Sequence, residues 1–292
     1  MAFEIEVRGQ QFWARLAGEP AFFIGTRLRY GARVGLGSVG RGAPASAVPY
    51  DAASYRLEFG LWADLIAPIV ACEGGSFTAL NSYDRAGFSF GIGQFAAHVP
   101  DGAFVGYLRR LVHLAEAAFY LPDWSLRNGR LHRRAGACAT EPLETATSTA
   151  ALRAALNPDA REIGPAELQA AARLIHWVTH HEDARRAQVA QMIDDARAQI
   201  THRARRVGPR VLTGAEACVI FDLCHHGRAG AGLTARLAKA LADAEPLSRL
   251  LEIGAARWGP RVDQLRAEIL SRPVLGRHVW DAARTEFVRA NQ

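Results

Sequence analysis

A glutamate and an aspartate close together in the sequence are the residues of this chain best suited to acid–base chemistry. Glu73 ends an apolar run and precedes Gly74 and Gly75, whereas Asp84 stands in a polar segment shortly before Ser89. A carboxyl group at the end of an apolar helix is partly desolvated, which raises its pKa and suits it to donate a proton at neutral pH. A second, ionised carboxylate across a cleft completes the pair that hydrolysis of a glycosidic bond requires.

The segment before Glu73 is expected to be a helix. A leucine or isoleucine recurs at every fourth position, which keeps these side chains on roughly one helical face; they are Leu57, Leu61, Leu65 and Ile69. Gly74 and Gly75 then end the helix, because glycine adopts the left-handed conformation at little cost. Pro68 predicts a kink about one turn before Glu73. The simpler alternative is a glutamate that ends a helix and faces water.

Residues 77–90 favour extended structure and predict a small β-hairpin. A turn at residues 84–87 would connect strands at 78–83 and 88–90. Asp84 and Ser89 then stand at the two ends of the turn, and the hairpin holds Asp84 across a groove from Glu73. The alternative is that Asp84 and Ser89 only stabilise the turn.

The string E-G-G-x(8)-D-x-x-G-x-S-x-G-I-G-Q, from Glu73 to Gln94, resembles the lysozyme superfamily, in particular phage-type lysozymes and the related chitosanases. The resemblance covers about thirty of the 292 residues. It implies a predominantly helical α+β fold with a lysozyme-like domain and a small β-hairpin at the active site. The sequence has serine at position 89, where phage-type enzymes often have threonine.

The same resemblance implies a role for each matched residue. Glu73 corresponds to the general acid, Asp84 to the carboxylate that activates or orients water, and Ser89 to the hydroxyl that helps to hold this water. Gln94 is similar to the glutamine that follows the glycines in goose-type lysozymes and lytic transglycosylases. Gln94, Tyr83 and His98 are the expected substrate-binding residues.

The expected activity is that of a muramidase, a glycoside hydrolase that degrades peptidoglycan and needs no metal or other cofactor. Lytic transglycosylases cut the same bond without a second carboxylate, so the presence of Asp84 favours hydrolysis. Chitosanase activity ranks third, because the chain has a net charge of +6 and a pI near 9.5, which favours an anionic polymer such as peptidoglycan over cationic chitosan.

The start of the chain does not resemble a signal peptide, since Glu4 and Glu6 interrupt it, and no stretch approaches the ~20 apolar residues of a membrane span. The expected protein is therefore made in the cytoplasm and reaches the periplasm or cell wall through a holin or a contact-dependent secretion route. It would be a phage endolysin or a bacteriolytic effector, and a delivery or immunity protein is a further possible partner.

Two domains are expected, an N-terminal extension at residues 1–50 and a helical catalytic domain at residues 51–292. Alternating apolar residues predict a strand at residues 3–7, another is expected within 22–36, and residues 37–49 have the composition of a linker. Residues 125–150 look irregular. The later helices are expected at residues 103–115, 164–180, 184–206, 217–225, 233–243, 246–258, 260–271 and 277–290, with a capping box at Thr213 and Glu216.

Three further features suggest other chemistry. Tyr120, Pro122 and Trp124 form an aromatic turn that either stacks on sugar rings or packs a loop. The pairs His180–His181 and His225–His226 lack the i, i+4 spacing of a zinc helix, and a zinc site between them would need chance proximity. Seven arginines between residues 184 and 210 are compatible with a nucleic-acid-binding helical protein, although a solvated helical face is the ordinary explanation.

Overall fold

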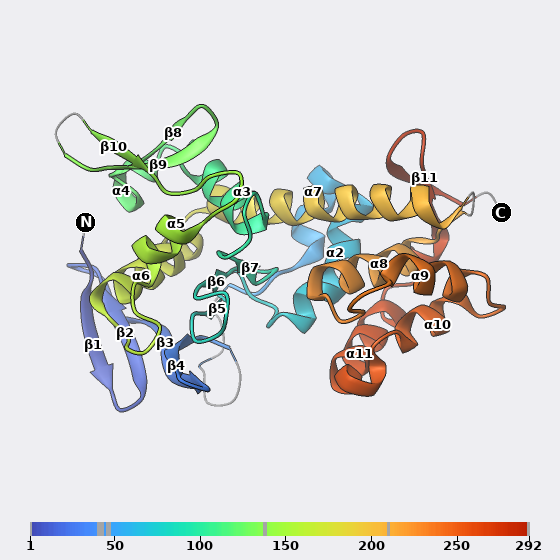
Figure 1. Cartoon of the computed structure of the whole chain (residues 1–292), viewed down its shortest axis with the longest axis horizontal. Coiled ribbons are helices and arrows are strands. Elements are labelled where there is room, and N and C mark those ends of the chain that lie inside the picture. Colours follow the sequence, from blue (N-terminus) through green and yellow to red (C-terminus); the bar gives the residue numbers. More distant parts are fainter. Residues whose placement is uncertain (1, 40–43, 45–47, 137–138, 209–210, 291–292) are drawn as a thin grey trace. The chain divides into compact units, whose positions relative to one another are not determined.

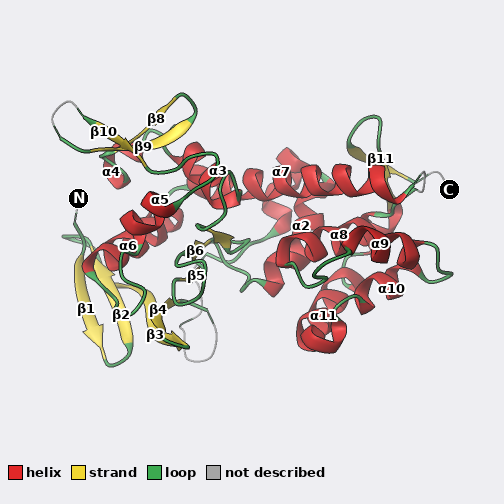
Figure 2. Cartoon of the chain, viewed as in Figure 1, coloured by secondary structure: helices red, strands yellow, loops and turns green. Residues whose placement is uncertain are grey.

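The fold is mixed α+β, as the sequence predicts, with 47% of residues in helices and 19% in strands (Figures 1 and 2). The computed structural model describes residues 2–39, 44, 48–136, 139–208 and 211–290. The lysozyme-like character of the fold stays an expectation.

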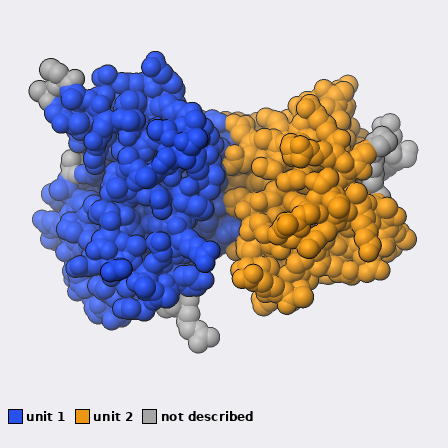
Figure 3. All heavy atoms as spheres, viewed as in Figure 1, with its two compact units in different colours: residues 1–49, 73–191 blue, residues 50–72, 192–292 orange. Residues whose placement is uncertain are grey.

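Two compact units make up the chain, and each is built from two segments (Figure 3). Unit 1 contains residues 1–49 and 73–191, and unit 2 contains residues 50–72 and 192–292. The chain therefore crosses between the units near residue 50, where a domain boundary is predicted, and again at Glu73. The division into an extension and a catalytic domain stays a prediction, and residues 40–43 and 45–47 of the expected linker lie outside the described residues.

Unit 1 is built on an antiparallel sheet whose seven strands follow chain order (Figure 2). The strands are β1 (Glu4–Arg8), β2 (Gln11–Arg15), β3 (Phe22–Tyr30), β4 (Arg33–Gly37), β5 (Leu80–Asn81), β6 (Ser89–Phe90) and β7 (Phe95–Ala96). The strands predicted in the first forty residues are confirmed. The predicted hairpin is confirmed as β5 and β6. Because β5 pairs with β4, the hairpin and the N-terminal strands belong to the same sheet.

Helix α6 (Pro165–His180) crosses one face of this sheet. It begins with Pro165, whose missing N–H is harmless in the first turn of a helix. The Gln169 side chain exchanges two hydrogen bonds with the backbone of Phe3, of 2.9 and 2.7 Å. The predicted helix at residues 164–180 is confirmed, and it ties the N-terminal strands to the rest of unit 1.

The remaining elements of unit 1 include a second sheet that the sequence analysis missed. They are α3 (Ala103–Leu111), α4 (Ala117–Tyr120), β8 (Trp124–Arg127), β9 (Arg130–Arg134), β10 (Thr140–Pro142) and α5 (Ala150–Leu156). The expectation that residues 125–150 are irregular is wrong, because β8, β9 and β10 pair as a three-stranded sheet. Asn128 and Gly129 turn between β8 and β9 with φ values of +50° and +73°, the geometry that an Asn-Gly hairpin requires.

Unit 2 is mainly helical. Its elements are η1 (Ala52–Tyr55), α1 (Arg56–Phe59), α2 (Leu61–Cys72), α8 (Gly214–His226), α9 (Leu233–Leu241), α10 (Pro246–Glu252), α11 (Ala255–Leu270), η2 (Pro273–Arg277), β11 (His278–Asp281) and β12 (Glu286–Arg289). Helix α7 (Glu182–Val207) begins in unit 1 and ends in unit 2. The predicted capping box is confirmed, since Thr213 and Glu216 exchange hydrogen bonds of 2.8 and 3.2 Å.

The helix expected at residues 277–290 is wrong, because β11 and β12 form a hairpin there. Trp280 pairs with Phe287 across the two strands, and both rings pack against Trp62 at centroid distances of 5.9 and 5.0 Å. Aromatic and β-branched residues favour such cross-strand packing, so tertiary contacts with Trp62 decide the structure of this segment.

The helix that precedes Glu73 differs from the predicted amphipathic one. Gly60, with φ of +56°, separates α1 from α2, and Leu57 is fully exposed, so its predicted place on the apolar face is wrong. Residues 62–70 are all buried, among them Asp64, whose carboxylate pairs with Arg56 at 2.6 Å, so this stretch of α2 has no exposed face. Within the described residues, none of the helices, α2 included, has the length and apolar character of a membrane span.

The three cysteines that the structure describes form no disulfide. Cys72 is half-buried at the end of α2, and Cys218 and Cys224 lie in α8. Burial raises the pKa of the Cys218 thiol well above its ordinary value, so this thiol is inert toward oxidants that attack thiolates. Cys138 lies outside the described residues.

Candidate active site

Asp84 is held in a tight turn just after strand β5. Its Oδ1 accepts a hydrogen bond from the Ala86 N–H at 2.8 Å, and its Oδ2 accepts one from the Asn81 side-chain amide at 3.1 Å. The Asn81 side-chain oxygen accepts from the Tyr83 N–H at 3.2 Å. The half-buried carboxylate therefore folds back over β5 toward Asn81. The sequence analysis did not identify Asn81, although its three-residue spacing from Asp84 in a turn is visible in the sequence.

Ser89 lies on the strand next to Asn81. Strand pairing aligns Gly37, Asn81, Ser89 and Ala96 across four adjacent strands. Opposed residues of antiparallel strands point to the same face of the sheet, so Ser89 and Asn81 share a face. Ser89 is only 4% exposed, and a hydroxyl in such a place can hold an ordered water. The structure thus brings Asp84, Asn81 and Ser89 into one group, whose roles stay predictions.

The Tyr83 ring covers the glycine end of this row. A Cβ atom on Gly37 would lie 3.3 Å from the Tyr83 ring and 2.4 Å from Leu28 Cδ1, so a larger residue at position 37 would require the Leu28 side chain to move. Burial raises the pKa of Tyr83, and the nearby charge of Asp84 raises it further. The Tyr83 hydroxyl is therefore a hydrogen-bond donor at neutral pH.

Glu73 is the first residue after α2 and is half-buried. Gly74 and Gly75 follow with φ values of +103° and +71°, which confirms the predicted glycine stop. A Cβ atom on Gly74 would lie 2.8 Å from Val39 Cγ1. Val39 follows β4, whose Gly37 pairs with Asn81. The turn that carries Glu73 and the strand that leads to Asp84 thus lie against the same short segment of unit 1. The proton-donor role of Glu73 stays a prediction.

Gln188 of α7 fixes the backbone at both edges of this region, and the sequence analysis missed it. Its side-chain oxygen accepts from the Ile92 N–H at 2.9 Å, and its amide donates to the Phe77 carbonyl at 3.1 Å. A Cβ atom on Gly91 would lie 2.4 Å from the Gln188 oxygen. The Gly-rich exit of the motif therefore lets a buried glutamine approach the backbone closely.

Gln94 and His98 lie at opposite ends of the short strands. Gln94 follows the turn at Gly91, whose N–H donates to Ala79 at 2.8 Å near the start of β5. His98 is exposed beyond β7, at the end where the Ala97 N–H donates to Phe88 at 2.8 Å. The structure thus places His98 at the Asp84 end and Gln94 at the other end.

Gln94 has an unusual backbone conformation and an unusual side-chain environment. Its φ of +44° lies in the left-handed region, a strained conformation that clusters at functional sites. Its side-chain Nε2 is buried and has no hydrogen-bond partner among the described residues. A buried amide without a partner costs free energy, so Gln94 is suited to donate to a ligand.

A buried carboxyl group lies close to the Asp84 turn, but it is not one that the sequence analysis selected. Glu167, in the first turn of α6, is completely buried. Its Oε1 accepts from the Ser82 hydroxyl and, at 3.1 Å, from the Leu36 N–H, while Oε2 has no hydrogen-bond partner within the described chain. Ser82 precedes Asp84 by two residues, so Glu167 positions the turn. In the sequence, Glu167 looks like an ordinary acidic residue at a helix start.

Glu167 predicts a specific pH dependence of stability. Burial raises the pKa of Glu167 from 4.5 to about 7, although the Ser82 hydroxyl lowers it. The folded chain therefore keeps this proton to a higher pH than the unfolded chain. The stabilisation is fully present below about pH 4.5 and is lost as the pH rises through about 7. Between pH 5 and 8 the folded state should lose on the order of 3 kcal/mol through this group.

Glu167→Gln removes this titration, so urea unfolding of the variant should lack this loss between pH 5 and 8. Glu162→Gln, at an exposed residue of the loop before α6, is the matched control and should follow the wild-type curve. Identical pH dependence in wild type and Glu167→Gln would show that Glu167 does not titrate in this range.

Two cavities lie away from this group. One of about 260 Å³ in unit 1 is lined by Trp124, Arg133, Arg173 and neighbouring apolar residues, and one of about 490 Å³ in unit 2 is lined by charged residues that include Lys239 and Arg249. Neither is lined by Glu73, Asp84 or Ser89. Trp124 therefore faces a cavity of unit 1, whereas its proposed stacking on sugar stays a prediction.

Tyr120 is a core residue rather than a sugar platform. Its ring stacks on Trp177 at a centroid distance of 4.7 Å, and its hydroxyl hydrogen-bonds His176 Nδ1 at 2.8 Å. Only 1% of Tyr120 is exposed. Of the two alternatives for the aromatic turn, loop packing applies to Tyr120.

The two histidine pairs have separate surroundings. His180 and His181 lie at the end of α6 in unit 1, whereas His225 and His226 end α8 in unit 2. His225 packs on Phe221 at 5.5 Å, and His226 packs on Trp258 at 4.6 Å. The second pair thus makes packing contacts within unit 2.

Comparison with known proteins gives no relative for this chain: no protein-family model, no curated protein and no solved structure matches it. The resemblance of residues 73–94 to lysozymes therefore stays an expectation from the sequence of these residues.

Proposed function

We propose that this chain is a glycoside hydrolase that cuts the glycan strands of peptidoglycan between N-acetylmuramic acid and N-acetylglucosamine. One observation carries the proposal. The Asp84 carboxylate accepts a hydrogen bond from the Asn81 amide at 3.1 Å. Asn81 pairs with the buried Ser89 on the next strand. The hairpin that carries these residues follows, in the sequence, a helix that ends next to Glu73. This is the order and chemistry of the lysozyme-like motif.

In the proposed reaction Glu73 protonates the leaving oxygen of the glycosidic bond. Asp84, together with Ser89, activates a water on the opposite face of the sugar. The reaction inverts the anomeric configuration if the two carboxyl groups are about 6.5–9.5 Å apart. The hydrogen bonds from Asn81 and Ala86 fix the orientation of the Asp84 carboxylate, which a base requires.

Lytic transglycosylation of the same bond is the second candidate. It is favoured by Gln94, whose buried amide has no partner within the described residues and which matches the glutamine of those enzymes. In that reaction a hydroxyl of the substrate attacks, so Asp84 would be dispensable. Chitosanase activity ranks below both, because the net charge of +6 repels a cationic polymer.

Nucleic-acid binding by helix α7 has little support from its arginines. Arg185 donates to the Val178 carbonyl at 2.7 Å, Arg197 pairs with Glu286 at 2.6 Å, and Arg203 donates to Thr234 at 3.1 Å. Arginines bound to protein groups are less able to neutralise phosphates. Delivery to the periplasm or cell wall, through a holin or a contact-dependent secretion system, belongs to this proposal, as does a partner that confers immunity.

The proposal is tested by incubating the purified chain with insoluble peptidoglycan and measuring new reducing ends and loss of turbidity. New reducing ends and a loss of turbidity are both expected. The heat-denatured chain is the control and should give neither. If the chain leaves peptidoglycan intact but binds DNA or RNA with an affinity that falls steeply with salt, the nucleic-acid alternative replaces the proposal.

A further inference from the structure

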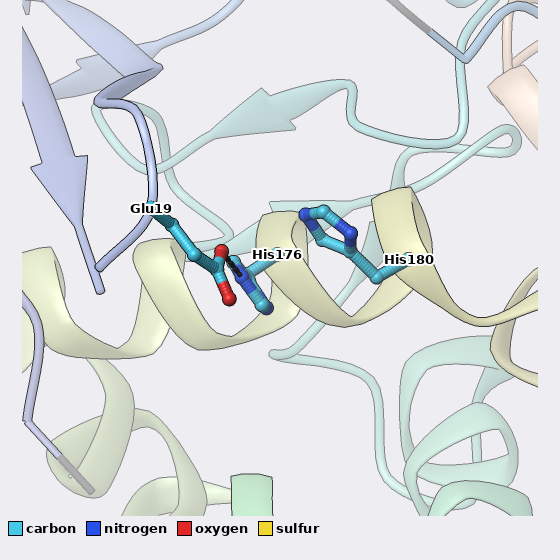
Figure 4. A group of neighbouring side chains, drawn as sticks. All are labelled: Glu19, His176 and His180. Atoms are coloured by element: carbon cyan, nitrogen blue, oxygen red, sulfur yellow. Dashed lines mark hydrogen bonds and ion pairs between the residues drawn. The ribbon is translucent and has the colours of Figure 1, made fainter. Parts of the chain in front are cut away.

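Three side chains of unit 1, none of them used by the proposed hydrolase, form a cluster with the donor set of a metal site (Figure 4). Within the described residues, Glu19, His176 and His180 are the three that bring ligand atoms within 4.8 Å of one another. Glu19 comes from the turn between β2 and β3, and the two histidines lie on successive turns of α6. We propose that this cluster binds a divalent transition-metal ion of the Zn²⁺ class and so clamps the β2–β3 turn onto α6.

The spacing of the two histidines supports a metal site. His176 and His180 are four residues apart, the i, i+4 spacing that places two imidazoles on one side of a helix for zinc. Their ring centroids are 4.2 Å apart. The third donor is a carboxylate, which gives the His₂Glu set of many zinc sites and leaves one tetrahedral position for water.

The distances require only a small adjustment. His176 Nε2 and Glu19 Oε2 are 2.8 Å apart, whereas two donors bound to Zn²⁺ at about 2.0–2.1 Å with tetrahedral angles are about 3.3 Å apart. The ion would thus replace the proton that these two atoms share. His180 is exposed, so its ring can turn toward the other two donors by a change of side-chain rotamer.

The surroundings of His176 suit a metal ligand. Its Nδ1 is hydrogen-bonded to the Tyr120 hydroxyl at 2.8 Å. A hydroxyl both donates and accepts, so the Tyr120 oxygen can accept a hydrogen bond from Nδ1–H when Nε2 binds the ion. Such a partner fixes the orientation and tautomer of a liganding histidine. His176 itself is 4% exposed and packs on the Phe3 and Phe22 rings at 5.3 and 5.5 Å, which holds its ring in place.

The consequence is a clamp on the N-terminal sheet. The turn that carries Glu19 connects two strands of that sheet, and Gln169 of α6 already binds the backbone of Phe3. The hydrogen bond between Glu19 and His176 ties the turn to α6 as well, and an ion at the cluster would replace this hydrogen bond with bonds to all three donors. Because the ion binds the folded arrangement, it should raise the melting temperature, and above the dissociation constant the rise should follow the logarithm of the ion concentration.

The test is titration of the full, reduced and chelator-treated chain with Zn²⁺ against a chromophoric chelator, with Mg²⁺ as the comparison ion. Wild type is expected to bind one Zn²⁺ and no Mg²⁺, because nitrogen donors favour the former. His180→Gln and Glu19→Gln should each weaken binding by about 100-fold or more, beyond the 10–100-fold effect of losing a group that only supports a ligand.

His181→Gln is the matched control, since this neighbouring histidine lies outside the cluster and approaches Glu116 at 3.6 Å; it should bind Zn²⁺ as wild type does. Both test variants change residues that are not buried, so each should fold, and its melting curve in chelator checks this. Failure of wild type to bind Zn²⁺, or equal affinity in His180→Gln and wild type, would overturn the proposal. Neither outcome bears on hydrolysis at Glu73.

Discussion

Replacing Glu73 with glutamine is expected to lower the rate of peptidoglycan cleavage by about 10²–10⁴-fold, the usual contribution of a general acid. Glutamine has nearly the same shape but carries no proton that it can give to a leaving oxygen. Glu73 is half-buried in a turn that Gly74 and Gly75 define by their own backbone, so the substitution should leave the fold intact. The rate is measured as the appearance of reducing ends from peptidoglycan.

Glu162→Gln is the control for this prediction, because it makes the same chemical change at an exposed site of unit 1. It should clear peptidoglycan at the wild-type rate. Circular dichroism melting of both variants separates loss of chemistry from loss of structure. A folded Glu73→Gln chain with undiminished activity would remove Glu73 from the mechanism.

Replacing Asp84 with asparagine is expected to cost about 10²-fold or more in rate if Asp84 is the base. The new amide keeps an oxygen for the Ala86 N–H but places a donor against the Asn81 amide, so a small loss of stability, on the order of 1 kcal/mol, should accompany it. Asp159→Asn is the matched control, since Asp159 also accepts a backbone N–H two residues later, at 2.8 Å. Wild-type activity in Asp84→Asn would instead support transglycosylation.

Asn81→Asp gives a sharper test of the same site. In the wild type, Asp84 Oδ2 accepts a hydrogen bond from the Asn81 amide at 3.1 Å. The substitution places a second carboxylate next to this oxygen. Two carboxylates so close raise the pKa of the pair, so the low-pH limb of the activity profile should move to higher pH. A low-pH limb that stays in place would show that ionisation of Asp84 does not limit activity.

The parts of the fold that short sequence signals control were predictable. The capping box of Thr213 and Glu216, the proline start of α6 and the glycine stop after Glu73 all depend on neighbours within a few residues. The hairpin at β5 and β6 was predictable for the same reason, because its turn residues include Asp84 and Gly87. Local chemistry alone decides these features.

Other features depend on partners far away in the sequence. The β11–β12 hairpin was predicted as a helix, since the ring of Trp62 that covers Trp280 and Phe287 is more than two hundred residues away. Helix α2 was predicted to be amphipathic, whereas residues 62–70 are buried on every side. Periodicity describes one exposed and one buried face, and it fails for a helix that has no exposed face.

The candidate site was predictable only in part. The predicted hairpin contains Asp84 and Ser89, as the structure shows. The polar residues that hold this region in place come from β5, α7 and α6; they are Asn81, Gln188 and Glu167. A polar residue of α6 or α7 carries no local signal that it will bind the segments on either side of the hairpin strands. The spacing of His176 and His180, by contrast, was readable in the sequence and was overlooked in favour of adjacent histidines, whereas Glu19 is separated from them by more than 150 residues.

Mass spectrometry of the fragments that the wild-type chain releases from peptidoglycan in ¹⁸O-labelled water tests hydrolysis at this site most directly. The account predicts muropeptides with a reducing N-acetylmuramic acid that carries one ¹⁸O atom, and their loss in Glu73→Gln. Fragments that end in an unlabelled anhydro sugar, or glycan strands that stay uncut, would contradict it.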